Sequence, residues 1–144
     1  MFNMFNMTAI RAGRAEDLAA VEAIQRASPE AAQWKVADYL EQDFRVAVEG
    51  DSVVGFVVLR DVAADEREVL NLAVGLNFRR RGVARELLRS SLRGFVGTVF
   101  LEVRESNTGA LEFYKSHKFQ EVSRRAKYYE NPVETAIVMK FHSC

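Results

Sequence analysis

The sequence predicts an α/β fold of the mixed α+β kind, a mixed central sheet flanked by helices. Two β-rich runs on either side of Gly50-Asp51 predict a hairpin, and strands alternate with helices farther along the chain. The 144 residues are 49% hydrophobic and 28% charged, which suits one globular domain of ordinary size. We expect a single domain over residues 9–142, preceded by a disordered leader over residues 1–8.

The N-terminal part is expected to contain one strand and two helices. Residues 8–11 are the strand candidate. From residue 15, apolar side chains recur at three-residue steps, which predicts an amphipathic helix: Leu18, Val21, Ile24 and Ala27. Pro29 ends this helix, because proline cannot continue it. A second short helix is predicted over residues 36–42.

Trp34 lies in the connection between these two helices. The more common reading of a tryptophan in a loop is packing against the core. The alternative is that Trp34 forms a wall of a substrate groove, where aromatic side chains are frequent.

The middle of the chain is expected to form three strands. Residues 45–49 and 52–59 form the hairpin around Gly50-Asp51. Residues 61–66 are polar and predict a loop, and residues 68–74 predict the third strand.

Residues 82–95 are predicted to form the strongest helix of the chain, with apolar side chains on one face and charged side chains on the other. Residues 98–103 are an almost continuous apolar run, which is typical of a strand buried on both faces.

The C-terminal part is expected to add one helix and two strands. Ser106 or Asn107 can cap the helix. Residues 119–123 and 135–141 predict the strands, joined by a charged and aromatic loop that suits Pro132.

Composition excludes several classes of protein. Lys+Arg and Asp+Glu number 20 each, whereas nucleic-acid-binding domains are usually clearly basic. No run approaches the roughly 18 apolar residues of a membrane span. The single cysteine, Cys144, cannot form an internal disulfide, which fits a reducing compartment. We therefore expect a cytoplasmic protein that binds neither nucleic acid nor membrane, and we identify no metal ligands.

A basic turn precedes the strongest helix. Arg79, Arg80 and Arg81 lead into Gly82. Cations beside a helix N-terminus are mildly unfavourable, whereas a bound anion would be held by both the backbone N–H groups and the arginines. The turn is therefore either a phosphate-binding loop or a solvated basic turn. It lacks the Gly-Lys-Ser/Thr of a Walker motif.

Two other residues allow both a structural and a catalytic interpretation. Glu102 lies within an apolar strand, where a carboxylate costs free energy unless it is paired or solvated; it is either a general base or one half of a salt bridge to Arg104 or another arginine. Tyr114 has apolar neighbours on its helix, which is typical of a core residue. By itself, Asn107 at a helix start is a cap.

Four segments together resemble the GNAT superfamily of acetyl-CoA-dependent N-acetyltransferases: Leu72-Ala73-Val74, Arg79-x-x-Gly82-x-Ala84, Leu101-Glu102-Val103-Arg104-x-Ser106-Asn107 and Phe113-Tyr114-Lys115. Within it, the third segment and Arg124-Arg125-x-Lys127-Tyr128-Tyr129 resemble the ribosomal-protein-alanine N-acetyltransferases. The resemblance implies a GNAT-like fold and acetyl-CoA as co-substrate.

The resemblance also implies roles for individual residues. Glu102 would be the general base and Tyr114 the general acid, while Tyr128 and Tyr129 would lie over the N-terminus of a substrate peptide. The residues that would contact acetyl-CoA are Leu72, Ala73, Val74, Arg79, Arg80, Arg81, Gly82, Val83, Ala84 and Asn107.

The implied function is transfer of an acetyl group to the N-terminal α-amine of a protein, such as a ribosomal protein. Two alternatives stay open: acetylation of a lysine, polyamine or other small amine, and a non-catalytic acyl-CoA-binding module. One departure concerns stability. Lys118 stands where these proteins usually have a glycine, so the helix either ends differently or carries a left-handed lysine at a cost of about 1 kcal/mol.

Overall fold

The computed structural model describes residues 8–129 and 133–143. Its strands follow the order β1-β2-β3-β4-β5-β7-β6, and the chain divides into two compact units. Residues up to 60 and residues 70–94 belong to the first unit, and residues 61–69 and those from 95 onward to the second. No helix in the described part of the chain is long and apolar enough to cross a membrane.

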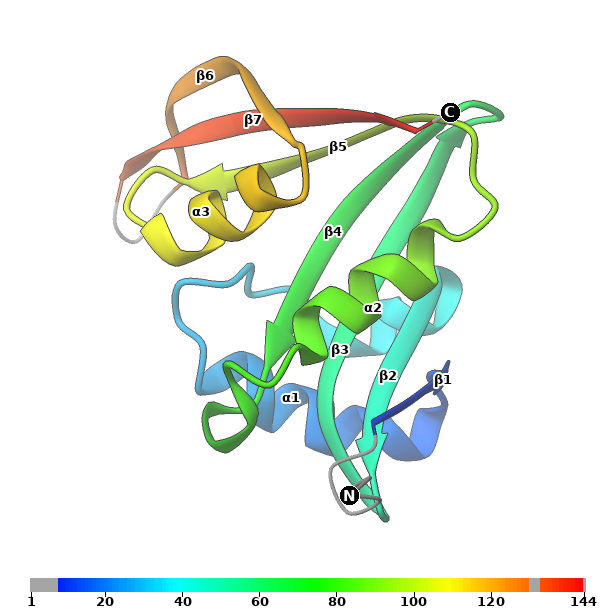
Figure 1. Ribbon diagram of the computed structural model, residues 1–144. Coiled ribbons are helices and arrows are strands. Elements are labelled where there is room, and N and C mark those ends of the chain that lie inside the picture. Colours follow the sequence, from blue (N-terminus) through cyan, green and yellow to red (C-terminus); the bar gives the residue numbers. More distant parts are fainter. Residues whose placement is uncertain (1–7, 130–132, 144) are drawn as a thin grey trace. The chain divides into compact units, whose positions relative to one another are not determined.

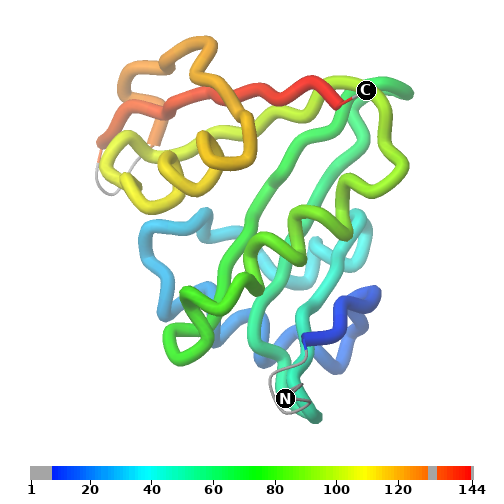
Figure 2. The backbone as a smooth tube through the Cα atoms, viewed as in Figure 1, coloured from blue at the N-terminus to red at the C-terminus, as the bar shows by residue number. Residues whose placement is uncertain are grey.

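The first unit contains β1 (Ala9–Ala12), β2 (Asp43–Glu49), most of β3 (Ser52–Ala63) and the end of β4 (Glu66–Val74). Strand β2 is antiparallel to both β1 and β3. The β2–β3 hairpin reverses at Gly50, whose φ of 60° favours glycine (Figure 2). This is the hairpin predicted from the sequence.

The helices of the first unit cover both faces of its strands (Figure 1). Helix α1 (Leu18–Arg26), preceded by the 3₁₀ turn η2 (Ala15–Asp17), and the 3₁₀ helix η3 (Val36–Glu41) lie on one face. They enclose a core with the strands, formed by Val21, Ile24, Tyr39, Phe44, Val46, Phe56, Val58 and Ala73.

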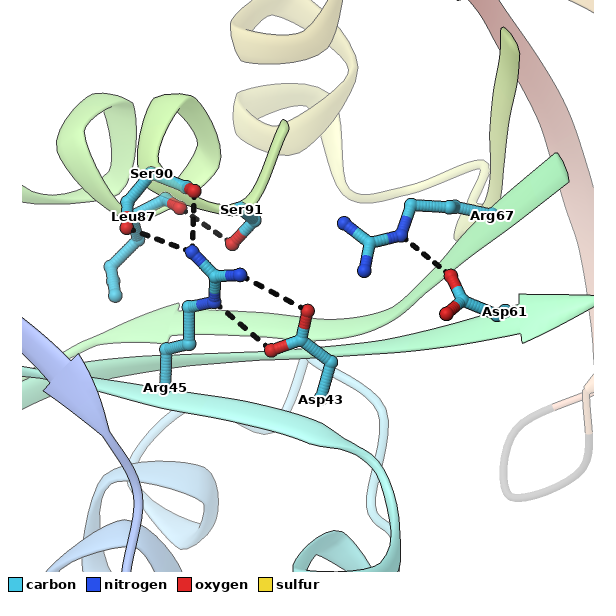
Figure 3. Close-up of polar contacts among 7 residues, drawn as sticks. All are labelled: Asp43, Arg45, Asp61, Arg67, Leu87, Ser90 and Ser91. Atoms are coloured by element: carbon cyan, nitrogen blue, oxygen red, sulfur yellow. Dashed lines mark hydrogen bonds and ion pairs between the residues drawn. The ribbon is translucent and has the colours of Figure 1, made fainter. Parts of the chain in front are cut away.

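Helix α2 (Val83–Leu92) covers the other face. A Cβ atom on Gly55 would lie 3.2 Å from Leu87 and 3.3 Å from Val83, so the absence of a side chain there lets α2 pack closely on β3. On β2, the Arg45 guanidinium pairs with Asp43 and donates to the Ser90 backbone oxygen of α2 (Figure 3).

The second unit contains the first residues of β4, with β5 (Gly97–Arg104), β6 (Gln120–Tyr129), β7 (Glu134–Ser143) and helix α3 (Thr108–Ser116). Glu66–Val69 of β4 run parallel to β5, while β7 is antiparallel to both β5 and β6. The sheet is therefore mixed, as predicted. The buried side chains of the second unit include Val99, Leu101, Val103, Tyr114, Phe119, Ile137 and Met139.

The predicted order of elements is confirmed, but several strand limits differ. The loop predicted over residues 61–66 is wrong: β3 continues to Ala63 and β4 starts at Glu66, with Arg67 donating to Asp61 at 2.7 Å (Figure 3). The polar side chains are tolerated because the end of β3 is exposed.

The strand over residues 98–103 is not buried on both faces. Val99, Leu101 and Val103 are buried, whereas the intervening side chains of β5 are only half-buried. Helix α2 ends at Leu92 rather than at residue 95, because Arg93 is extended. The predicted helix over residues 36–42 is a 3₁₀ helix. Pro132, Cys144 and most of the expected leader lie outside the described residues.

Candidate active site

The basic turn of the first unit connects β4 to α2. After the 3₁₀ turn η4 (Leu76–Phe78), Arg80 and Gly82 both adopt left-handed backbone conformations, with φ of 64° and 80°. Gly82 is the N-cap of α2, and its carbonyl accepts from the Glu86 N–H at 3.0 Å. The first amides of α2 have no partner within the helix. This end of α2 thus offers N–H donors and a positive dipole to an anion.

The three arginines of this turn differ in their contacts. Arg79, whose side chain is 40% exposed, donates from Nε to the Val74 carbonyl at 3.1 Å and from Nη2 to Ser28 Oγ at 3.0 Å. Arg81 lies over the Phe78 ring and 3.4 Å from a Glu49 oxygen. The Arg80 side chain is exposed. Arg79 therefore ties the turn to Val74 and Ser28, and Arg80 extends from its surface.

The strand segment expected to contact acetyl-CoA has two backbone groups held by side chains. The Leu72 N–H donates to Asn71 Oδ1 at 3.0 Å, and the Val74 carbonyl accepts from Arg79. Ala73 and Val74 are buried. Asn71 was missed by the sequence reasoning, although a polar residue within the apolar run of β4 is the signal that could have found it.

Trp34 is 52% exposed, so the expectation that it packs against the core is wrong. Its carbonyl accepts from Gln25 Nε2 at 2.7 Å, which attaches the backbone to α1 and leaves the indole at the surface. The interpretation of Trp34 as part of a substrate groove stays a prediction.

Glu102 lies on the half-buried face of β5, with 17% of its side chain exposed. Its carboxylate is 3.2 Å from the Arg125 guanidinium. The negative charge of Glu102, followed by burial, raises the pKa of Tyr128. The salt bridge that the sequence allowed therefore exists, but its arginine is Arg125 of β6 rather than Arg104.

Tyr128 and Tyr129 lie at the end of β6, not in the predicted loop. Burial, together with the charge of Glu102, raises the pKa of Tyr129 to about 12. Arg104 stacks on the Tyr129 ring at 4.3 Å, and Arg125 lies 5.1 Å from the centre of the Tyr128 ring. One carboxylate, two phenols and two arginines thus form a single cluster on β5 and β6.

Tyr114 lies on α3 and is 6% exposed, packed against Phe119 with ring centroids 5.3 Å apart. Burial raises the pKa of its hydroxyl, so the phenol carries its proton at neutral pH. Asn107 caps α3 as predicted, with Oδ1 accepting from the Ala110 N–H at 3.1 Å. The core position of Tyr114 and its protonated state are both compatible with a general acid.

Comparisons with known proteins agree on one family. A sequence profile of the acetyltransferase (GNAT) family matches residues 14–119. The [ribosomal protein bS18]-alanine N-acetyltransferase of Salmonella typhimurium is 35% identical over 106 residues, covering 69% of this chain and 71% of that protein.

Two solved structures share the fold over nearly the whole chain. Ard1 from Thermoplasma volcanium superposes with a TM-score of 0.87 at 28% identity, covering 95% of this chain and 98% of that one. The ribosomal-protein-S18-alanine N-acetyltransferase from Escherichia coli has a TM-score of 0.79 at 27% identity, covering 94% of each chain.

Proposed function

The chain belongs to the acetyltransferase (GNAT) family, whose enzymes take their acetyl group from acetyl-CoA, and from this premise we propose that it acetylates the N-terminal α-amine of another protein. The named activity of its Salmonella typhimurium relative supports this acceptor, and a ribosomal protein is the first candidate. Such an acceptor would place the reaction in the cytoplasm.

The observation that carries the proposal is the position of Glu102. Its carboxylate is largely buried, pairs with Arg125, and lies close enough to Tyr128 and Tyr129 for its charge to raise the pKa of both phenols. A carboxylate in this setting can attract an ammonium group and take its proton, directly or through one water. The two phenol rings, which already stack with Arg104 and Arg125, provide faces that suit a cationic N-terminus.

The chemistry of the acceptor favours an α-amine. Its pKa is about 7.7–8.0, against about 10.4 for a lysine side chain. Near neutral pH a weak base therefore suffices to free an α-amine, whereas a lysine would need much stronger assistance. We assign the pyrophosphate of acetyl-CoA to the amides at the start of α2 and to the exposed Arg80, because that turn combines N–H donors with a cation.

In the proposed reaction, Glu102 accepts a proton from the ammonium group and the free amine attacks the thioester carbonyl. The new C–N bond forms as the C–S bond breaks, and Tyr114 donates its proton to the leaving thiolate. Its raised pKa keeps that proton in place until the sulfur develops charge. No covalent intermediate with the enzyme is needed.

The test measures acetylation of N-terminal peptides by mass spectrometry, together with acetyl-CoA binding. We expect Glu102→Gln and Tyr114→Phe each to lower kcat by about 10²- to 10⁴-fold with acetyl-CoA affinity nearly unchanged. Glu105→Gln is the control, because Glu105 is an exposed carboxylate near Glu102 in sequence that pairs only with the solvent-facing Arg124 among the contacts observed. Unaltered rates in both catalytic variants would refute the assigned roles.

A panel of acceptors tests the substrate class separately. Peptides with free N-termini, peptides with blocked N-termini and internal lysines, and small polyamines are offered at pH 7. Turnover confined to lysines or polyamines would overturn the α-amine assignment, and binding of acetyl-CoA without any turnover would indicate a non-catalytic module.

A further inference from the structure

Three polar side chains of the first unit are almost completely buried: Gln25 on α1, Tyr39 on η3 and Asn71 on β4, which are 5%, 2% and 6% exposed. The Tyr39 hydroxyl donates to Gln25 Oε1 at 2.5 Å and lies 3.1 Å from Asn71 Nδ2, from which it can accept. Buried polar groups are costly unless they are paired, and these three side chains are paired with one another and with the backbone.

The cluster holds the segment between α1 and η3. Asn71 Nδ2 donates to the Ala32 carbonyl at 2.9 Å, and Gln25 Nε2 donates to the Trp34 carbonyl at 2.7 Å. Two backbone carbonyls of an irregular segment are therefore fixed from inside the protein. The Trp34 indole, which belongs to this segment, stays half-exposed.

The same asparagine also holds the strand proposed to contact acetyl-CoA. Asn71 Oδ1 accepts from the Leu72 N–H at 3.0 Å, while Asn71 Nδ2 donates to the Ala32 carbonyl and to the Tyr39 hydroxyl. One side chain thus connects the β4 backbone at Leu72 to the segment that carries Trp34. Gln25 also accepts from Asn71 Nδ2 at 3.1 Å, but among the contacts observed it bonds the β4 side chain and not the β4 backbone at Leu72.

We propose that Asn71 is a positioning residue that holds the segment carrying Trp34 in the conformation that receives the acceptor peptide. This proposal rests on the proposed function, and it adds a role for Asn71 and Gln25 in acceptor binding. Neither side chain need touch the peptide. Each acts by fixing a carbonyl of the segment.

The experiment compares Asn71→Leu and Gln25→Leu. Both variants should raise the KM of an acceptor peptide on the order of tenfold, since each removes a buried hydrogen-bond partner. Only Asn71→Leu should also weaken acetyl-CoA binding, because only Asn71 bonds Leu72. A loss of stability alone would not produce this split. Val46→Ala shrinks the same core but removes none of the hydrogen bonds of the cluster, so it is the control for stability and should leave both constants unchanged.

A second readout needs no activity. Trp34 is the only tryptophan in the sequence, so its fluorescence anisotropy and its quenching by acrylamide report on this segment. We expect lower anisotropy and stronger quenching in both leucine variants and not in Val46→Ala. Unchanged Trp34 signals in the leucine variants would overturn the proposal. It would also be overturned if Trp34 became more mobile in these variants while the KM of the acceptor peptide stayed unchanged.

The two readouts also separate this proposal from the proposed function. If the wild-type protein acetylated no peptide, the proposed function would fail while the fluorescence still tested the anchoring of the segment. Tyr39→Phe removes only a hydroxyl from the cluster, so it provides a milder variant if either leucine variant fails to fold.

Discussion

At the scale of single residues, Lys118 shows that the protein tolerates local strain. Its φ of 72° lies in the left-handed region, which is one of the two alternatives that the sequence left open for this helix end. The Phe119 N–H donates to the Tyr114 carbonyl and the Lys118 N–H to the Lys115 carbonyl, both at 3.0 Å. This is the Schellman pattern, in which a glycine normally occupies the left-handed position.

We predict that Lys118→Gly stabilises the protein by about 1 kcal/mol, because glycine adopts this conformation without the steric penalty of a Cβ atom. Urea unfolding measures the change. Lys118→Ala is the matched control: it removes the same charge but keeps the strain, so it should have almost no effect. An equal gain in both variants would show that charge, not backbone strain, is the cause.

Asp17 offers a test of pH dependence at the same scale. The Arg11 guanidinium donates to both carboxylate oxygens, at 2.7 and 2.9 Å, and the Arg14 N–H donates at 2.8 Å. These bonds, the one from Arg11 foremost, lower the pKa of Asp17 in the folded protein. Folding thus favours the ionised form, so the stabilisation is complete well above the unfolded pKa and is lost as pH falls through the folded one.

We therefore predict that Asp17→Asn lowers the free energy of unfolding by about 2 kcal/mol at pH 7, a loss that shrinks as the pH falls below about 4. Denaturant titrations at pH 7, 5 and 3 measure this. Glu16→Gln, at the exposed neighbouring position, should change little. A difference between wild type and Asp17→Asn that stays constant down to pH 3 would contradict the linkage.

At the scale of elements, Gly82 at the start of α2 adopts a left-handed backbone conformation and also borders the proposed anion site. Gly82 and Gly94 flank α2 with nearly the same φ, 80° and 78°. A Cβ atom on Gly82 would come no closer than 4.0 Å to its neighbours, and one on Gly94 would meet nothing within 4 Å. The two glycines differ in that only Gly82 borders the proposed anion site.

We predict that Gly82→Ala and Gly94→Ala each destabilise the protein by roughly 1 kcal/mol through backbone strain. Only Gly82→Ala should weaken acetyl-CoA binding, because its methyl group would stand where the pyrophosphate approaches the amides of α2. Unfolding curves and calorimetric titration separate the two effects. Equal affinities in both variants would remove Gly82 from the cofactor site.

At the scale of the whole molecule, the formal net charge of zero means that the overall charge does not draw in an anionic co-substrate. Recognition of acetyl-CoA must therefore come from local groups, which we propose to be the amides of α2 and the arginines before it. A ligand that binds only the folded state raises its stability according to its concentration and affinity.

Acetyl-CoA at 100 times its Kd should therefore stabilise the protein by about 2.7 kcal/mol, which corresponds to a rise in Tm of roughly 8–10 °C. Thermal unfolding with and without ligand measures the rise. Adenosine, which lacks the pyrophosphate, should give a much smaller shift at the same concentration. If adenosine matched acetyl-CoA, the basic turn would not be the anchoring site.

The sequence by itself determined what depends on short-range chemistry. The order of elements, the hairpin at Gly50 and the Asn107 cap all follow from interactions within a few residues. The motifs around Glu102 and Tyr114 predicted the family for the same reason, since they are contiguous stretches of chain.

Only the tertiary structure decided how far strands extend and which distant side chains meet. Strand β6 reaches Tyr129 because Tyr129 pairs with Glu134 of β7, beyond an irregularity in the register after Arg125. Glu102 pairs with Arg125, which is 23 positions away, and Gln25 bonds Asn71, which is 46 positions away. The exposure of Trp34 likewise depends on contacts between distant parts of the chain. Local patterns cannot specify these pairs, because burial and pairing are set by which elements pack together.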